Sequence, residues 1–67
     1  GTAPAALSAA NEVAVEAFLE GQIAWVEIAR VVESVLINHN GDRDPDLEAV
    51  LDADAMARIL AKELIAT

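Results

Sequence analysis

Cysteine is absent from this sequence, which excludes disulfides and thiolate metal ligands and suits a reducing compartment. Basic residues are scarce: four lysines and arginines stand against twelve acidic residues, giving a formal net charge of −8. Without a basic patch to neutralise phosphates, we expect neither nucleic acid nor an anionic membrane as a partner. No apolar run approaches the length of a membrane span, and no signal-peptide pattern is present. These absences predict a cytoplasmic protein.

Glycine and proline are also few, three and two, and no strand-like alternation of apolar and polar residues occurs. The glycines stand far apart, at positions 1, 21 and 41, so they form no phosphate-binding loop. Hydrophobic residues, many of them alanine, make up 55% of the 67 residues and recur at helical spacing. We therefore predict one all-α domain, a small antiparallel bundle of three to four helices with a marginal core.

The first predicted helix covers about residues 4–20. Thr2 is its candidate N-cap, and Pro4 suits a first turn. Gly21 is the expected stop, because glycine adopts a left-handed conformation without steric cost. The apolar face is expected to consist of Leu7, Ala10, Ala14 and Phe18, and the solvated face of Glu12, Glu16 and Glu20.

Asn11 is the one polar residue set toward the predicted apolar face of this helix. A half-buried amide must find hydrogen-bond partners or cost stability. We expect Asn11 to tie this helix to a neighbouring element; the alternative is a contact with a part of the protein outside this chain.

A second helix is predicted over about 25–37, with Trp25 packing near the corner after a short connection. Glu27 lies in its first turn, where a carboxylate interacts favourably with the helix dipole. Its apolar stripe is expected to contain Trp25, Ile28, Ala29, Val32, Val35 and Leu36.

The segment 38–44 has the composition of an exposed loop, and Asp44 followed by Pro45 is typical of an N-cap and first helical residue. Two short helices are predicted next, over about 45–51 and 53–65, with Asp52 or Asp54 capping the second. One continuous helix, giving three in total, is the alternative. The apolar residues of this region are Leu47, Val50, Leu51, Met56, Ile59, Leu60 and Leu64.

The candidate metal-binding and catalytic residues lack the partner residues that such sites require. His39 is the one histidine, and without a second histidine or a cysteine we expect an exposed imidazole and no zinc ligand. A calcium loop starting at Asp42 would need glycine and glutamate where Leu47 and Ala53 stand. Neither Ser8 nor Ser34 has a histidine at helical spacing, and the expected role of Lys62 is a solvated partner of the helix dipole. We predict no catalytic, cofactor-binding or metal-binding residue in this chain.

One stretch resembles a known family. Residues 7–28 read LSAANEVAVEAFLEGQIAWVEI, which is similar to the C-terminal region of 1-deoxy-D-xylulose 5-phosphate (DXP) reductoisomerase, where LNAANEVAVEAFLEG is typical. Ser8 and Trp25 depart from that pattern, replacing an asparagine and a phenylalanine. Weaker matches follow at 28–36 and at Leu47, Val50, Leu51, Asp54, Ala55, Ala57 and Arg58.

The resemblance implies a bacterial enzyme of non-mevalonate isoprenoid biosynthesis that isomerises and reduces DXP to 2-C-methyl-D-erythritol 4-phosphate. It would have an NADPH-binding Rossmann domain, a catalytic domain holding Mg²⁺ or Mn²⁺, and a C-terminal four-helix bundle of which this chain is part. The functional residues of that family lie upstream of the matched region, so none is carried over.

We therefore expect a support domain whose partner is the upstream catalytic domain. The chain is expected to start after the first helix of the bundle, leaving an exposed apolar groove along Leu7, Phe18 and the stripe of the second helix. Self-association through that groove is possible on the same grounds. The alternative hypothesis is a free-standing acidic helical module for interaction or oligomerisation.

Overall fold

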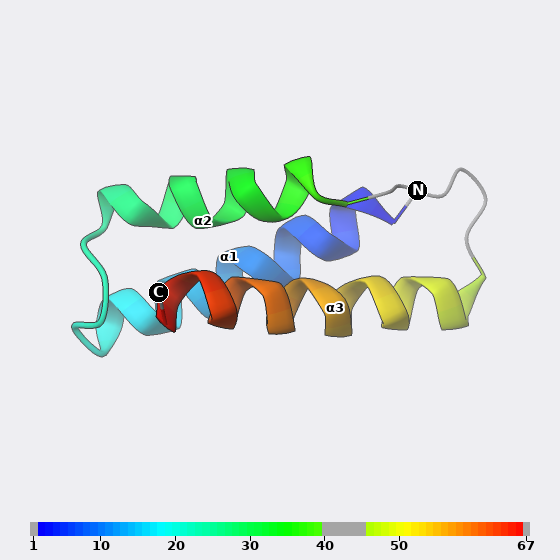
Figure 1. Cartoon of the computed structure of the whole chain (residues 1–67). Helices are drawn as coiled ribbons and strands as arrows, with labels where there is room; N and C mark the ends of the chain where they lie inside the picture. The colour runs from blue at the N-terminus through cyan, green and yellow to red at the C-terminus, as the bar shows by residue number, and fades with distance from the viewer. Residues whose placement is uncertain (1, 40–45, 67) are drawn as a thin grey trace.

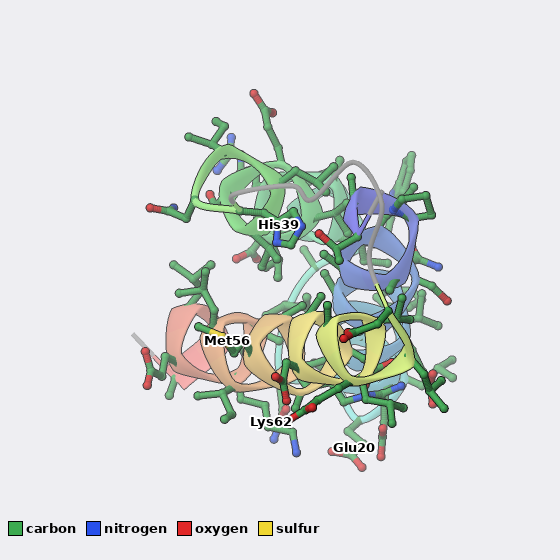
Figure 2. All side chains as sticks on the ribbon, turned by 90° about the vertical axis from the view of Figure 1, so that its right-hand side faces the viewer. Glu20, His39, Met56 and Lys62 are labelled. Carbon is green, nitrogen blue, oxygen red and sulfur yellow. The ribbon has the colours of Figure 1, made fainter. Side chains whose placement is uncertain are left out.

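The computed structural model describes residues 2–39 and 46–66, and within these ranges the chain is helical, with no strand. Helix α1 covers Ala3–Leu19, α2 covers Val26–Ile37 and α3 covers Leu47–Ala66. Along the bundle, α2 runs opposite to α1 and α3 (Figure 1). Viewed from one end, α2 and α3 lie on either side and α1 forms the third corner, packed against both (Figure 2). The predicted all-α antiparallel bundle is confirmed.

Helix α1 ends where the sequence predicts. Gly21 has a φ of 77°, the left-handed conformation that glycine adopts without a Cβ clash. Its N–H donates to the carbonyl of Phe18, and the N–H of Gln22 donates to the carbonyl of Ala17. This pair of bonds is the Schellman arrangement, which satisfies carbonyls left free at a helix end. At the other end, Pro4 lies in the first turn, but Thr2 makes no side-chain capping bond.

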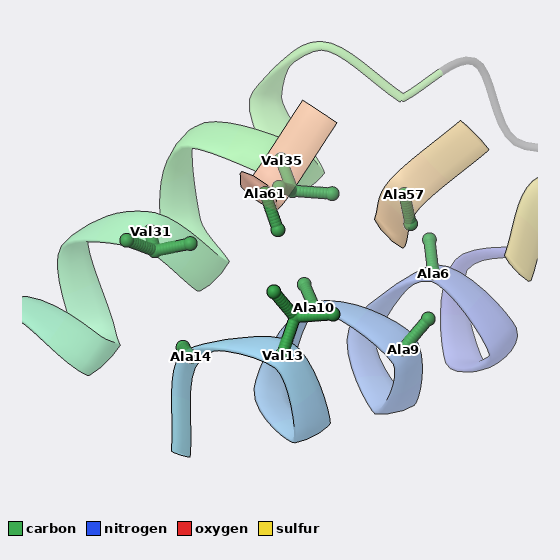
Figure 3. Close-up of a cluster of buried hydrophobic side chains, with 9 residues drawn as sticks. All are labelled: Ala6, Ala9, Ala10, Val13, Ala14, Val31, Val35, Ala57 and Ala61. Carbon is green, nitrogen blue, oxygen red and sulfur yellow. The ribbon is translucent and has the colours of Figure 1, made fainter. Parts of the chain in front are cut away.

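The core is built mainly from small side chains (Figure 3). Its buried residues are Ala6, Ala9, Ala10, Val13, Ala14, Val31, Val35, Ala57 and Ala61. Alanines on facing sides of α1 and α3 let the two backbones approach closely, so larger side chains are displaced to the edges. The predicted apolar face of α1 was correct for Ala10 and Ala14, which are buried, and wrong for Leu7 and Phe18, which are 45% and 39% exposed.

Helix α3 is continuous, so the predicted break near Asp52 was wrong. The carboxylate of Asp54 accepts a hydrogen bond from Nε of Arg58 one turn later, at 2.7 Å, and therefore needs no helix end to satisfy it. The helix begins at Leu47, and Oδ1 of Asp46 accepts the N–H of Ala49 at 2.8 Å, which is the N-cap interaction. The predicted cap at Asp44 and Pro45 lies outside the described residues.

The corner before α2 also differs from expectation. Trp25 is 70% exposed, whereas Ile23 packs against the core, so the aliphatic residue of the connection holds the corner. The carboxylate of Glu27 accepts the N–H of Ala24 at 3.0 Å, in line with its predicted place in the first turn. At the far end, the side-chain amide of Asn38 donates to the carbonyl of Ser34 at 2.8 Å.

Candidate functional site

An open groove with a volume of about 600 Å³ lies between α2 and α3. It exists because α1 packs against both helices from one side, while no helix of the described chain covers them from the other (Figure 2). This groove is called here the α2–α3 groove, and its apolar lining consists of Val35, Ala49, Ala53, Met56, Ala57, Ile59 and Leu60.

Helix α3 supplies most of the lining. Positions 49, 52, 53, 56, 57, 59, 60 and 63 all line the groove, and their spacing by three and four places them on one side of the helix. Met56 is 70% exposed and Ile59 is 59% exposed, although both carry large apolar side chains. Figure 2 shows Met56 on the side of α3 that faces α2, with His39 facing α3 from across the groove. Side chains of this kind at this spacing are typical of a surface that packs against another helix.

Among the described residues, the lysine, arginine, aspartate and glutamate side chains that line the groove are all acidic. Asp52 and Glu63 line it, about three turns apart on α3. Within residues 2–39 and 46–66, no lysine or arginine lines this groove. The groove therefore combines an apolar floor with acidic groups along α3.

His39 lines the groove just after the end of α2. Its Nε2 lies 2.7 Å from the hydroxyl of Thr2, a residue that is only 3% exposed, so this bond joins the end of α2 to the start of α1. The expectation of an exposed imidazole was wrong, because His39 is half-buried and has a partner. No local pattern could reveal the pairing, since the two residues lie far apart in the sequence.

Arg58 makes the polar contact between α1 and α3. Its Nη2 lies 3.0 Å from a carboxylate oxygen of Glu12, and Nε lies 2.7 Å from Oδ1 of Asp54. The hydrogen bonds that Arg58 donates to the carboxylate of Asp54 and then to that of Glu12 raise the pKa of Arg58 above its ordinary value. Glu12, Glu16 and Glu20 are all exposed, as predicted, and Glu12 also contacts α3 through this ion pair. This cluster is a structural contact between two helices and lies outside the lining of the groove.

The expectation that Asn11 is half-buried was wrong. Asn11 is exposed, because the buried face is centred on the alanines and leaves Asn11 beside Leu7 and Phe18 at its edge. The expected exposed groove along Leu7, Phe18 and the stripe of the second helix stays a prediction, and Leu7 and Phe18 are exposed. Of those residues, the α2–α3 groove contains only Val35.

The described ranges contain no group of three histidine, aspartate or glutamate side chains placed to hold a metal ion. None of the helices in these ranges combines the length and the apolar character that crossing a membrane requires. Lys62 is exposed, and the predicted lack of catalytic and cofactor-binding residues stays a prediction.

Comparison with known proteins identifies the family of this chain. A family model described as the DXP reductoisomerase C-terminal domain matches residues 1–60. The chain belongs to this family. Among curated relatives, the DXP reductoisomerase of Burkholderia lata is 61% identical over 98% of this chain, and that of Cupriavidus necator is 57% identical over 98%. The enzyme of Ruminiclostridium cellulolyticum is 51% identical over 97% of the chain.

This DXP reductoisomerase C-terminal domain is a small part of those relatives. The chain spans about 17% of the length of the Burkholderia lata and Ruminiclostridium cellulolyticum enzymes. No solved structure matches the chain. The family membership agrees with the resemblance of residues 7–28 to DXP reductoisomerase.

Proposed function

We propose that this chain is the C-terminal support domain of a DXP reductoisomerase of isoprenoid biosynthesis, and that it braces the catalytic part of that enzyme. The observation that carries the proposal is the α2–α3 groove, whose apolar floor is open. Membership of the DXP reductoisomerase C-terminal domain family supports the identity of the enzyme. Large apolar side chains such as Met56 and Ile59 are costly to leave in water, and packing against a larger body would bury them.

In this proposal the chemistry takes place elsewhere in the polypeptide. The parent enzyme would be cytoplasmic and bacterial, and it would use NADPH and a divalent metal, Mg²⁺ or Mn²⁺, in upstream domains. The described residues of this chain do not fit either group, since they offer no three-ligand cluster and the sequence has no glycine-rich phosphate loop. The contribution of this chain would be to hold the catalytic domain in its folded form.

A chimera tests the proposal. The matching segment of the Burkholderia lata enzyme, which is 61% identical, is replaced by this chain, and DXP-dependent oxidation of NADPH is measured. We expect kcat and KM within about tenfold of the parent enzyme, since the changes lie outside the reacting centre. A second variant lacks the segment altogether. It should be inactive and should have a lower Tm than the parent enzyme. Full activity and unchanged Tm in that deletion would overturn the support role.

Self-association is the second candidate function, and the same exposed apolar residues favour it. The net charge of −8 opposes it, because two copies repel each other at low ionic strength. Sedimentation equilibrium of the 67-residue chain at low and high salt measures the outcome. A dimer that forms at both salt concentrations would favour the interaction module over the support domain.

A further inference from the structure

We draw no further inference here: the strongest candidate, the groove of about 570 Å³ between α1 and α3 that is lined by apolar side chains and by Glu16, Glu20 and Lys62, carries none, because nothing in the structure shows what covers it.

Discussion

The hydroxyl of Thr2 and Nε2 of His39 lie 2.7 Å apart and join the start of α1 to the end of α2. Thr2 is buried, so the bond is shielded from water on one side. It fixes the relative position of two helix ends at the mouth of the α2–α3 groove, which both residues line. Long-range polar contacts of this kind add to a core made mostly of alanine.

Replacing Thr2 by valine should weaken this junction. Thr2→Val keeps the shape of the side chain and removes the hydroxyl that pairs with His39. We expect the free energy of unfolding to fall by about 1 kcal/mol, the usual net value of such a bond. Urea denaturation measures the change, and Thr2→Ser, which keeps a hydroxyl, should lose less. The ring signals of the one histidine in an NMR spectrum should move in the valine variant, and an unchanged spectrum would contradict the contact.

Gly21 offers a test of backbone conformation alone. Its φ is +77°, and a Cβ added there would meet no atom within 4 Å, so alanine brings strain without a clash. Gly21→Ala should lower the free energy of unfolding by about 1 kcal/mol. Gly21→Asn should cost less, because asparagine tolerates the left-handed region better. Thermal unfolding followed by circular dichroism compares the three proteins; equal Tm values for alanine and glycine would rule out the Schellman ending.

Local signals in the sequence were sufficient for the helices. The glycine stop after α1, the first-turn proline and the helical spacing of apolar residues each depend on neighbours a turn away, and the structure confirms the helices they predict. The predicted break in α3 was wrong because Asp52 and Asp54 lie within the helix and cap no helix end. The i, i+4 bond between Asp54 and Arg58 shows how an aspartate is satisfied inside a helix.

Tertiary packing was the part that the sequence pattern could not resolve. Helical spacing places Leu7, Ala10, Ala14 and Phe18 on one face. It does not show that the close approach of α1 and α3 buries the alanines and leaves the larger side chains at the edge. The same pattern also gave no indication of the groove between α2 and α3. Its signal was present in the spacing of Met56, Ile59 and Leu60, but only the positions of α1 and α2 show that this side of α3 is uncovered.

The contact between Arg58 and Glu12 should contribute only modestly to stability. Both side chains are partly exposed, at 35% and 64%, so water screens the pair. Glu12→Gln should lower the Tm by about 2 to 4 °C at low salt and by less at high salt. The matched control is Glu16→Gln, one turn further along α1 at an exposed position with no ion pair in the described part of the chain. A salt-independent loss in the Glu12 variant would contradict an electrostatic role.

The alanine contact between α1 and α3 should be the least tolerant of larger side chains. Ala57 is 4% exposed and packs in the core with Ala6, Ala9 and Ala10, so leucine at this position would force the two helices apart. Ala57→Leu should lower the free energy of unfolding by about 1 to 3 kcal/mol through overpacking, although leucine is the more hydrophobic residue. Ala55→Leu, on the exposed side of the same helix, is the control and should change stability by less than about 0.5 kcal/mol. Urea denaturation measures the free energy of unfolding of both variants. A gain in stability for Ala57→Leu would mean that the space between α1 and α3 is underfilled and would contradict close packing of the two helices.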